Sequence, residues 1–451
     1  MKPGALPVFD GKFGPAEAAR LLWRAGFGPA RGEGHALAKK GLKAAVGSLL
    51  KPPPYVAQGP EPTDGKGQPL APYDAVGHDH SWWLDRMVRG NQPLVERMTL
   101  VWHDWFATSN QGVGSQKLML DQNILFRARW AGSFEQLLYG ITTNPAMLLW
   151  LDGNRNRVGK PNENYAREMM ELFTLGADNG YTEQDVREQA RALTGWRNDN
   201  SKITGPTNFR YDPALHDTGV KTVFGKSGNY DWTDACHFAL QNPAHPQFFV
   251  ERLWSYFIPL SELDAKTAKL LRAAYVSSGY RTRPVLKAIL LHPALFEGPR
   301  MVKGPVVYTA GLLRALGRGV DTIDWMRLDD AAGQRLFYPP NVAGWDESRW
   351  LDTQTYRARW AVASNVLKPF ALDPAKALGN QPSTPAALLA RALAFWGNPT
   401  LSTAMQTVLK QFAARALADA GQDSYRQRTY PTLVENALRQ LIVVTPDHLT
   451  C

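Results

Sequence analysis

The stretch PLVERMTLVWHDWFATS, residues 93–109, decides the fold, because its apolar residues recur every three to four positions. On a helix with about 3.6 residues per turn they form one stripe: Leu94, Met98, Val101, Trp102 and Trp105. Pro93 stands at the start, where a helix accepts a residue without a backbone N–H. The pattern predicts a helix from Pro93 to Ser109.

The same helical period dominates the rest of the chain. A second clear case starts at Pro15 and ends at Gly26, with an apolar stripe made of Ala18, Leu21, Leu22 and Ala25. Further helices are expected over residues 33–50, 115–130, 133–143, 161–175, 182–195, 245–258, 262–277, 284–292, 303–317, 353–368, 385–397, 402–419 and 424–443. Alternation typical of strands is confined to Asn208–Tyr211 and Val220–Phe224, which predict one short β-hairpin closed by a polar loop. We therefore predict a mainly α protein, a large multi-helix globular bundle with one short β-hairpin.

Two segments rich in proline interrupt the helical pattern. Residues 52–72 hold seven Pro and three Gly in 21 positions, which is typical of an extended linker or a surface loop. Residues 371–385 form a second, shorter break. The predicted organisation is an N-terminal helical segment over 1–51 that packs on the main body, a linker or surface loop over 52–73, and a main helical domain over 74–451.

Length and composition exclude several classes of protein. The chain has 451 residues, of which 44% are hydrophobic and 20% charged, as in ordinary folded proteins. Two cysteines, Cys236 and Cys451, are too few for a disulfide scaffold, a cysteine-rich zinc module or an iron–sulfur cluster. No uninterrupted apolar run is long enough for a transmembrane helix. The start, MKPGALPVFDGKFGP, lacks the apolar region of a signal peptide, which favours the cytoplasm by default and leaves export with a partner open.

The formal net charge of +10 is uneven along the chain. Residues 1–60 hold nine Lys and Arg against Asp10, Glu17 and Glu33, a net charge of +6. Such a basic end can bind nucleic acid or an anionic surface. No nucleic-acid-binding motif accompanies it, so we interpret it as a solvated helix face and expect no sequence-specific nucleic acid partner. The P-loop, Rossmann, nucleophile-elbow and HExxH motifs are absent too, which makes the corresponding enzymes poor candidates.

The densest group of polar residues lies in PNENYAREMMELFTLG, residues 161–176. Between a proline that suits a helix start and a glycine that suits a helix end, one polar face collects Glu163, Asn164, Arg167, Glu168 and Glu171. Two carboxylates one turn apart beside an arginine can bind a cation or transfer protons. The alternative is an exposed face held by Glu163–Arg167 and Arg167–Glu171 ion pairs, and spacing alone favours this alternative.

In VWHDWFA, residues 101–107, His103 and Asp104 lie among three large aromatic residues, so this part of the helix is expected to be largely buried. A histidine in such a setting is either a core residue with satisfied hydrogen bonds or a ligand or acid/base group. Glu96, seven positions earlier, falls on the face of His103 and can orient its ring.

Three other segments carry further candidates. In HDTGVK, His216, Asp217 and Lys221 flank a flexible glycine, which is typical of a substrate-gripping loop and equally of an Asp-type turn. In GQRLFYPPNVAGW, residues 333–345, two prolines exclude a helix. Asn341 and Trp345 there suit a sugar- or polymer-binding surface or, more frequently, a loop packed onto the core. In GHDHSWW, residues 77–83, two histidines face the same way if the segment is extended, but two ligands do not make a metal site.

Several of these phrases together resemble the bacterial domain-of-unknown-function 1800 family, in the family's order: ARLLWRAGFGP, PLVERMTLVWHDWFA, NPAMLLWLDG, PNENYAREMMELFTLG, YTEQDVREQARALTGW, HDTGVKTVFG and GQRLFYPPNVAGW. The resemblance runs from about residue 14 to the C-terminal end. The family has no settled biochemical role to carry over. Its members often carry export signals and are often encoded beside a domain-of-unknown-function 1501 protein, which is similar to alkaline phosphatases and sulfatases. The resemblance therefore implies an envelope-associated pair of proteins.

The chain departs from the family's pattern at two points. The phrase W-H-x-H-F appears as Trp102–Phe106 with Trp105 in place of the second histidine, which weakens a metal site on this helix. An export leader is also missing, which argues against an envelope location.

Residues 161–176 are the most specific part of the resemblance and hold more polar groups than a capped surface helix requires. We therefore predict that the polar side chains of this helix, Glu163, Asn164, Arg167 and Glu168, face inward to a cavity that His103 and the pair His216–Asp217 approach. Arg167 would then be the internal counter-ion, Glu168 or Glu163 the acid/base group or ligand, and His103 the proton shuttle.

Two functions remain open on this basis. The first is a hydrolase or transferase acting on a glycan, peptide or ester, with a cavity that is also compatible with a divalent metal ion. Its catalytic residues would be His103, Glu163, Asn164, Arg167 and Glu168, and its substrate-binding residues His216, Asp217, Lys221, Asn341 and Trp345. The second is a non-catalytic partner that binds or helps export a neighbouring hydrolase, using its basic N-terminal end and its tryptophan-bearing loops. Convergence of the candidate segments on one pocket favours the first function, and scatter over the surface favours the second.

Overall fold

The structure, a computed structural model, describes residues 5–376 and 383–451 and is built mainly from helices. The first third contains α1 (Pro15–Arg24), α2 (Glu33–Lys40), α3 (Leu42–Leu50), α4 (His78–Arg89), α5 (Pro93–Trp105), α6 (Asn110–Val113) and α7 (Gln116–Ala128). The helix predicted over 33–50 is divided in two because Gly41 adopts φ 74° and ψ 157°, outside the helical region. Residues 77–83, which we considered as an extended segment, instead form the N-cap and the first half of α4.

The middle third contains α8 (Phe134–Thr142), α9 (Pro145–Trp150), α10 (Glu163–Glu168), α11 (Glu183–Ala192), α12 (Trp232–Gln241), α13 (His245–Ser255), α14 (Ala265–Ser277), α15 (Thr282–Leu291) and α16 (Pro293–Glu297). Short 3₁₀ turns cover Gly153–Arg155, Pro213–Leu215 and Leu260–Glu262. The helix predicted over 161–175 is continuous, but it changes type after Glu168. Its last part, η2 (Met169–Thr174), is a π-helix, a form found mostly as single turns within α-helices.

The last third contains α17 (Pro305–Leu316), α18 (Asp324–Ala331), α19 (Thr353–Leu367), α20 (Pro385–Phe395), α21 (Thr403–Ala418), α22 (Ser424–Val443) and α23 (Pro446–Leu449). Two more 3₁₀ turns cover Glu347–Arg349 and Lys368–Phe370. The long segment 332–352 between α18 and α19 holds the GQRLFYPPNVAGW phrase and has no helix of its own apart from one such turn.

Strands in the described residues form two separate two-stranded antiparallel sheets, so the mainly α fold class is confirmed. β1 (Trp196–Ser201) pairs with β2 (Gly205–Tyr211), and β3 (Lys221–Val223) pairs with β4 (Lys226–Gly228). The predicted pairing of 208–211 with 220–224 is wrong, because each segment finds a nearer partner across a tight turn. Phe224 and Gly225, both at positive φ, form the two-residue loop that favours the β3–β4 hairpin.

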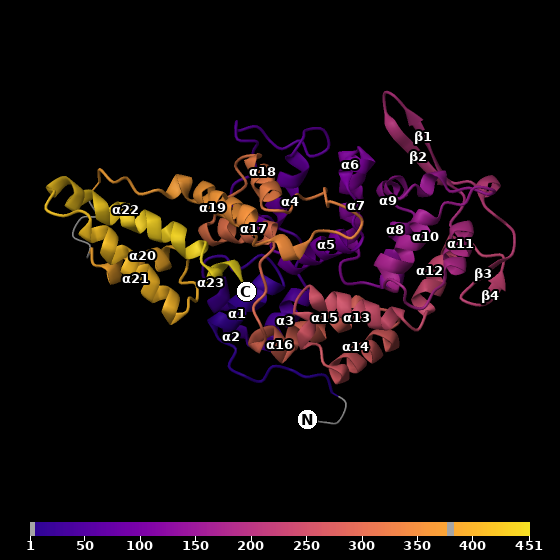
Figure 1. Ribbon diagram of the computed structural model, residues 1–451, viewed down its shortest axis with the longest axis horizontal. Coiled ribbons are helices and arrows are strands. Elements are labelled where there is room, and N and C mark those ends of the chain that lie inside the picture. Colours follow the sequence, from indigo (N-terminus) through magenta and orange to yellow (C-terminus); the bar gives the residue numbers. More distant parts are fainter. Residues whose placement is uncertain (1–4, 377–382) are drawn as a thin grey trace.

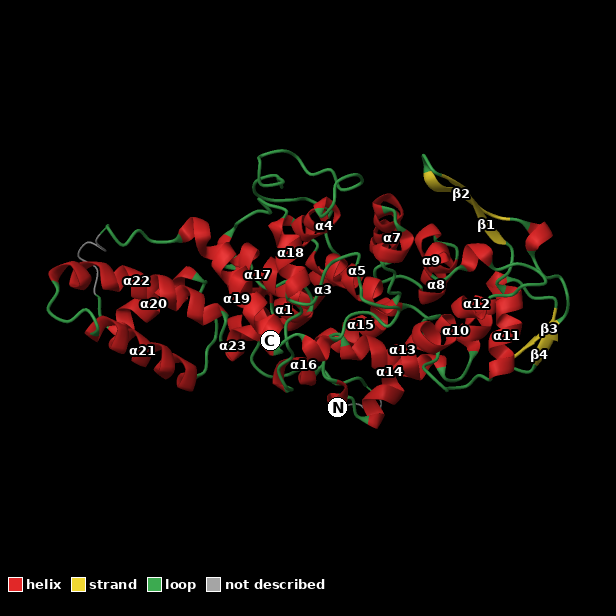
Figure 2. Ribbon diagram, turned by 45° about the horizontal axis from the view of Figure 1, so that its top comes forward, coloured by secondary structure: helices red, strands yellow, loops and turns green. Residues whose placement is uncertain are grey.

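The molecule is elongated (Figure 1), with α20, α21 and α22 at one end and α10–α12 and both sheets at the other. Figure 2 shows β1 and β2 standing out from the helices as an arm. None of the helices in residues 5–376 and 383–451 is both long and apolar enough to cross a membrane.

Two hydrophobic clusters form the interior, and α5 lies between them. Trp102 and Trp105 belong to the first cluster, together with α1, α3, α8, η2, α13 and α15. Leu100, from the opposite face of α5, belongs to the second cluster with α4, α17, α19, α20 and α22. The helix predicted from the opening stretch is therefore buried almost all round, as its aromatic content indicated.

The C-terminal segment returns to α1. Arg24, buried in α1, donates hydrogen bonds from Nε and Nη2 to the carbonyl oxygen of Cys451 at 3.1 and 2.6 Å. A β-bridge joins Val302 to Thr450, so the segment before α17 and the segment after α23 run side by side. The first helix, the start of α17 and the last residues thus share one part of the molecule.

Candidate functional site

His103 lies on the face of α5 that packs against the segment 332–352. Its Nε2 accepts a hydrogen bond from the backbone N–H of Phe337 at 3.2 Å. The rings of Trp83, Phe337 and Trp345 surround it at centroid distances of 5.5, 5.6 and 5.4 Å. Its side chain is 1% exposed, and this burial lowers the pKa of His103 from 6.5 to about 3. The ring is therefore neutral near pH 7, with one nitrogen already engaged, an environment that disfavours the predicted proton shuttle.

The neighbouring Asp104 holds the same loop from the next position of the helix. Its Oδ1 accepts from the backbone N–H of Trp345 at 2.9 Å, and its Oδ2 accepts from the Tyr256 hydroxyl at 2.7 Å. Burial raises the pKa of Asp104, and these two donors work against that rise. Gly344 touches this carboxylate at φ +94°, where an added Cβ would lie 2.3 Å from Asp104 Oδ1. Only glycine therefore allows the loop to approach so closely.

A third side chain, His80 of α4, completes the support of the loop. Its Nδ1 accepts from the backbone N–H of Leu336 at 3.2 Å, and its Nε2 lies 3.1 Å from Asp329 Oδ2. The VWHDWFA and GQRLFYPPNVAGW phrases are thus two halves of one packing unit, in which α4 and α5 supply acceptors for the loop backbone. This pairing could not be predicted from local patterns, because the partners are separated by more than two hundred residues.

The two loop residues predicted to bind substrate have different surroundings. Trp345 is buried against His103, as in the alternative of a loop packed onto the core. Asn341 is exposed, and its Oδ1 accepts from the backbone N–H of Ala343 at 2.8 Å, which closes a local turn. Their role in substrate binding stays a prediction.

The polar face of α10 points outward instead of into an interior cavity. Arg167 forms a two-pronged ion pair with Glu183 of α11, at 2.7 and 2.8 Å. It also lies 3.3 Å from Glu163 and 3.5 Å from Glu171. The Arg167 side chain is 32% exposed, and Asn164 is exposed as well. The Glu163–Arg167 and Arg167–Glu171 pairs were the alternative favoured by spacing, and the predicted inward-facing cavity is wrong, because these charges find partners at the surface without desolvation.

Glu168 differs from the other carboxylates of this face. It is half-buried and, within the described residues, makes no hydrogen bond or ion pair. Burial, and then the nearby Glu171, raise the pKa of Glu168. An unpaired carboxyl with a raised pKa is the arrangement that a general acid requires.

The π-turn η2 fixes the apolar half of the same phrase. Its last three carbonyl oxygens accept hydrogen bonds from side chains of other helices: Leu172 from Arg252, Phe173 from Trp105 Nε1 at 3.0 Å, and Thr174 from His245 Nδ1 at 2.9 Å. These residues end the helix, so their carbonyl oxygens have no partner within it. Nothing in the spacing of MMELFT indicates the π-turn, so this part of the helix could not be predicted.

Side chains of α11 also hold the HDTGVK loop in place. Asp217 accepts from Arg191 Nε and Nη2 at 2.8 and 3.1 Å, and Arg191 also donates to Glu188 at 2.8 Å. Lys221 is buried and donates to the backbone carbonyls of Asp217 and Gly219. His216 lies 3.0 Å from the carbonyl oxygen of Thr194 through Nδ1.

The α10 face and the HDTGVK loop therefore both contact α11, but they do not share one cavity. The Glu183 and Arg191 contacts lie eight positions apart on α11, which is about 12 Å along a helix axis. His103 shares no hydrogen bond or ring contact with either network among the described residues. In the same residues, no group of three or more His, Cys, Asp or Glu side chains is placed to hold a metal ion.

Comparison of the chain with known protein families agrees with the family resemblance of its sequence phrases. A family model described as protein of unknown function DUF1800 matches residues 20–450. The match covers nearly the whole chain, so the protein belongs to this family, and the resemblance seen in the sequence is confirmed. No curated protein and no solved structure matches the chain.

Proposed function

We propose that this DUF1800 protein is a non-catalytic binding partner of a second protein, and that the arm formed by β1 and β2 carries the contact. The observation behind the proposal is the exposure of the arm. At its tip, between the strands, Ile203 is 95% exposed, more than any other large apolar residue in the described part of the chain. An exposed apolar side chain at the tip of a projecting hairpin is free to enter an apolar contact on another protein.

The backbone of the arm supports the same role. β1 and β2 have no third strand beside them in the described residues, so each has one edge without a strand partner. Such an edge pairs readily with an extended segment of another chain. Cross-strand ion pairs, Arg197–Asp212 at 3.1 Å and Arg210–Asp199 at 3.0 Å, help to order the arm before it binds.

The base of the arm is anchored in the body. Trp196 at the start of β1 packs against Tyr211 at the end of β2, with ring centroids 5.6 Å apart, and against Trp232 of α12 at 5.8 Å. A rigid base lowers the entropy lost on binding. The partner that the resemblance implies is a DUF1501-family protein of the sulfatase and phosphatase type, and we adopt it as the partner of this proposal.

The test is a binding measurement between the full chain and a purified DUF1501-family protein. We expect a complex in size-exclusion chromatography and a measurable Kd by interferometry. Ile203→Glu should weaken binding by about tenfold or more, because it places a charge in an apolar contact. Val76→Glu, at an exposed apolar residue (71% exposed) outside the arm, is the matched control and should bind like the wild type. Absence of a complex with the wild type, or equal affinity of the Ile203→Glu variant, contradicts the proposal.

Glu168 favours a second candidate function, a hydrolase or transferase with Glu168 as its general acid. The support is the half-buried carboxyl with a raised pKa and no partner. Glu168→Gln keeps the shape of the side chain and removes its proton. Turnover of chromogenic esters and glycosides should then be present in the wild type and lost in the variant at unchanged Tm. Turnover that survives Glu168→Gln excludes this role.

A further inference from the structure

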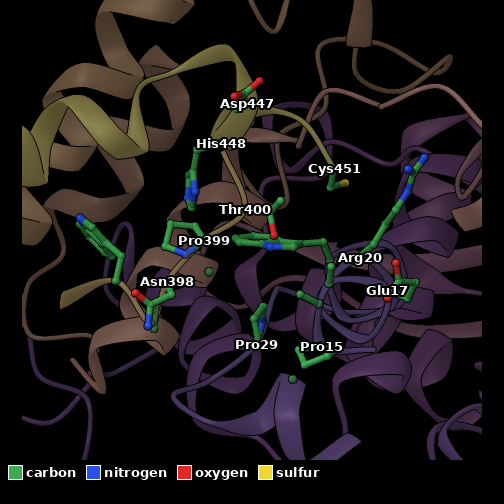
Figure 3. Close-up of a pocket in the computed structure, with 18 of the residues that line it drawn as sticks. Pro15, Glu17, Arg20, Pro29, Asn398, Pro399, Thr400, Asp447, His448 and Cys451 are labelled. Atoms are coloured by element: carbon green, nitrogen blue, oxygen red, sulfur yellow. The ribbon is translucent and has the colours of Figure 1, made fainter. Parts of the chain in front are cut away.

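A pocket with a volume of about 340 Å³ lies where α1 meets the last residues of the chain (Figure 3), away from the arm and from the segments predicted to be functional. Its walls come from α1, the turn before α2, the segment before α17 and the second half of that helix, the turn between α20 and α21, and α23. The volume is within the range of pockets that hold small molecules. Neither the sequence phrases nor the function proposed above accounts for it.

Lys303 lines this pocket as a buried cation. It is 3% exposed, and its Nζ donates to the carbonyl oxygen of His448 and lies 3.6 Å from the ring centroid of Trp23. No Asp or Glu side chain of the described residues forms an ion pair with it. An ammonium group has three donors, so one remains after these two contacts. Burial lowers the pKa of Lys303 to about 7, and a negative charge at Cys451 works against this fall.

His448 supplies a second unsatisfied group. It is 8% exposed, and its Nε2 has no hydrogen-bond partner among residues 5–376 and 383–451. Figure 3 shows its ring pointing away from α23 toward Pro399. A buried imidazole nitrogen is normally paired, so an unpaired one beside a buried ammonium indicates a place for a ligand.

The rim of the pocket carries charges of both signs. Arg20, Arg31 and Arg300 line it together with Glu17 and Asp447, and Arg300 lies 3.8 Å from Asp447. With Lys303, four basic side chains stand against these two acidic side chains and the negative charge at Cys451. The excess of basic groups favours an anion.

The remaining wall is apolar and rigid. Trp23 is held between two glycines, since an added Cβ on Gly311 would lie 2.1 Å from its Cη2 and one on Gly28 would lie 2.7 Å away. Trp396, 6% exposed, lines the pocket from the α20–α21 turn, and Phe296 lines it from α16. A ligand here meets aromatic rings beside basic groups, because Lys303 Nζ lies over the ring of Trp23 and the ring of His448 lies 5.9 Å from it.

We propose that this pocket binds a small organic anion, a carboxylate or phosphate monoester with an apolar group. The anionic group accepts from Lys303 Nζ and His448 Nε2, and the apolar group packs against Trp23 and Trp396. This inference goes beyond the binding of a partner through the arm and does not depend on it.

The test is calorimetric titration of the full chain at low ionic strength with probes that separate the two halves of the site. Phenyl phosphate and phenylacetate carry both halves, inorganic phosphate carries only the anionic half, and benzyl alcohol carries only the apolar half. We expect saturable binding of at least one two-part probe, at least about tenfold tighter than either one-part probe. The stronger of phenyl phosphate and phenylacetate identifies the anionic group. Equal affinity for benzyl alcohol and the two-part probes, or no saturable binding of either two-part probe, overturns the proposal.

Variants locate the binding in the pocket. Lys303→Met keeps the length of the side chain and removes its charge, and it should weaken the two-part probe by about tenfold or more. Arg31→Gln, at an exposed rim residue, leaves the fold intact and should weaken binding about two- to threefold. The matched control is Lys43→Gln, an exposed lysine of the same basic segment that does not line the pocket and should bind like the wild type. If Lys303→Met folds, and both it and Arg31→Gln bind the two-part probe as tightly as the wild type, the proposed site is rejected. If Lys303→Met does not fold, the affinity of the Arg31→Gln variant alone decides whether the probe binds in this pocket.

Discussion

The phrase on α5 and the phrase on α10 use similar residues in opposite ways. Both place acidic, basic or imidazole groups among large apolar residues. On α5, His103 and Asp104 point into the protein and accept from backbone N–H groups of a distant loop. On α10, Arg167 and its carboxylates point outward and pair with other side chains. The comparison teaches that burial decides which partner a polar residue takes, since a buried group must satisfy fixed backbone donors and an exposed one can use solvent and mobile side chains.

The two regions should therefore respond differently to substitution. A side chain that satisfies buried donors leaves them unpaired when it is removed, whereas exposed ion pairs can be replaced by water. We expect substitution of Asp104 to lower the free energy of unfolding most and substitution of Arg167 to lower it least.

Asp104→Ala should show the largest effect, a loss of roughly 3 kcal/mol in the free energy of unfolding. It removes the acceptor of two donors, Trp345 N–H and the Tyr256 hydroxyl, and each unpaired buried donor costs about 1–3 kcal/mol. Urea denaturation followed by circular dichroism measures the loss. Tyr256→Phe is the control, because it removes one of the two bonds and should cost about half as much. A loss below about 1 kcal/mol in Asp104→Ala contradicts the anchoring role.

Gly344→Ala should cost about 2 kcal/mol or more, because the backbone is at φ +94° and the new Cβ would meet the Asp104 carboxylate at 2.3 Å. Gly114→Ala provides the matched control. Gly114 has φ +67° and nothing within 4 Å of its Cβ position, so only the backbone strain of about 1 kcal/mol remains. Equal losses in the two variants, measured by urea denaturation, show that the loop does not pack tightly on α5.

His103 predicts a pH dependence. Its pKa in the folded protein, about 3, lies below its value of 6.5 in the unfolded chain, so the unfolded chain binds the extra proton between these values. Its contribution to stability is present above pH 6.5 and is lost as the pH falls, by about 2 kcal/mol between pH 7 and pH 5. His103→Gln keeps an acceptor for Phe337 N–H and should flatten the pH dependence by that amount. His237→Gln, at an exposed histidine, should leave it unchanged. Parallel stability curves for His103→Gln and the wild type from pH 7 to pH 5 contradict the buried neutral state.

The sequence predicted local structure well and long-range pairing poorly. The helix from Pro93 and the exposed pairs of Arg167 could be read from spacing, because both depend on positions three or four apart. The predicted meeting of His103 with the Glu163 face could not be judged from the sequence. It depends on which side of α5 packs against which cluster, and α5 is apolar on nearly all sides. The helix break at Gly41 and the π-turn that begins at Met169 could not be predicted for a different reason. At both places the backbone conformation changes locally while the spacing of the apolar residues stays helical.

The arginine of α10 should show the smallest effect, although it has the most ion pairs. Arg167 contacts Glu183, Glu163 and Glu171, yet its side chain is 32% exposed and that of Glu183 is 61% exposed. Water competes for such pairs, and salt screens them. A double-mutant cycle with Arg167→Met and Glu183→Gln should give a coupling energy below about 1 kcal/mol that decreases as salt is added. The variants keep the apolar stem and the side-chain length, so packing changes little. A coupling energy above about 2 kcal/mol that is insensitive to salt would mean that this face is desolvated. That result would favour the inward-facing polar cavity, with Glu163 and Glu168 in the interior.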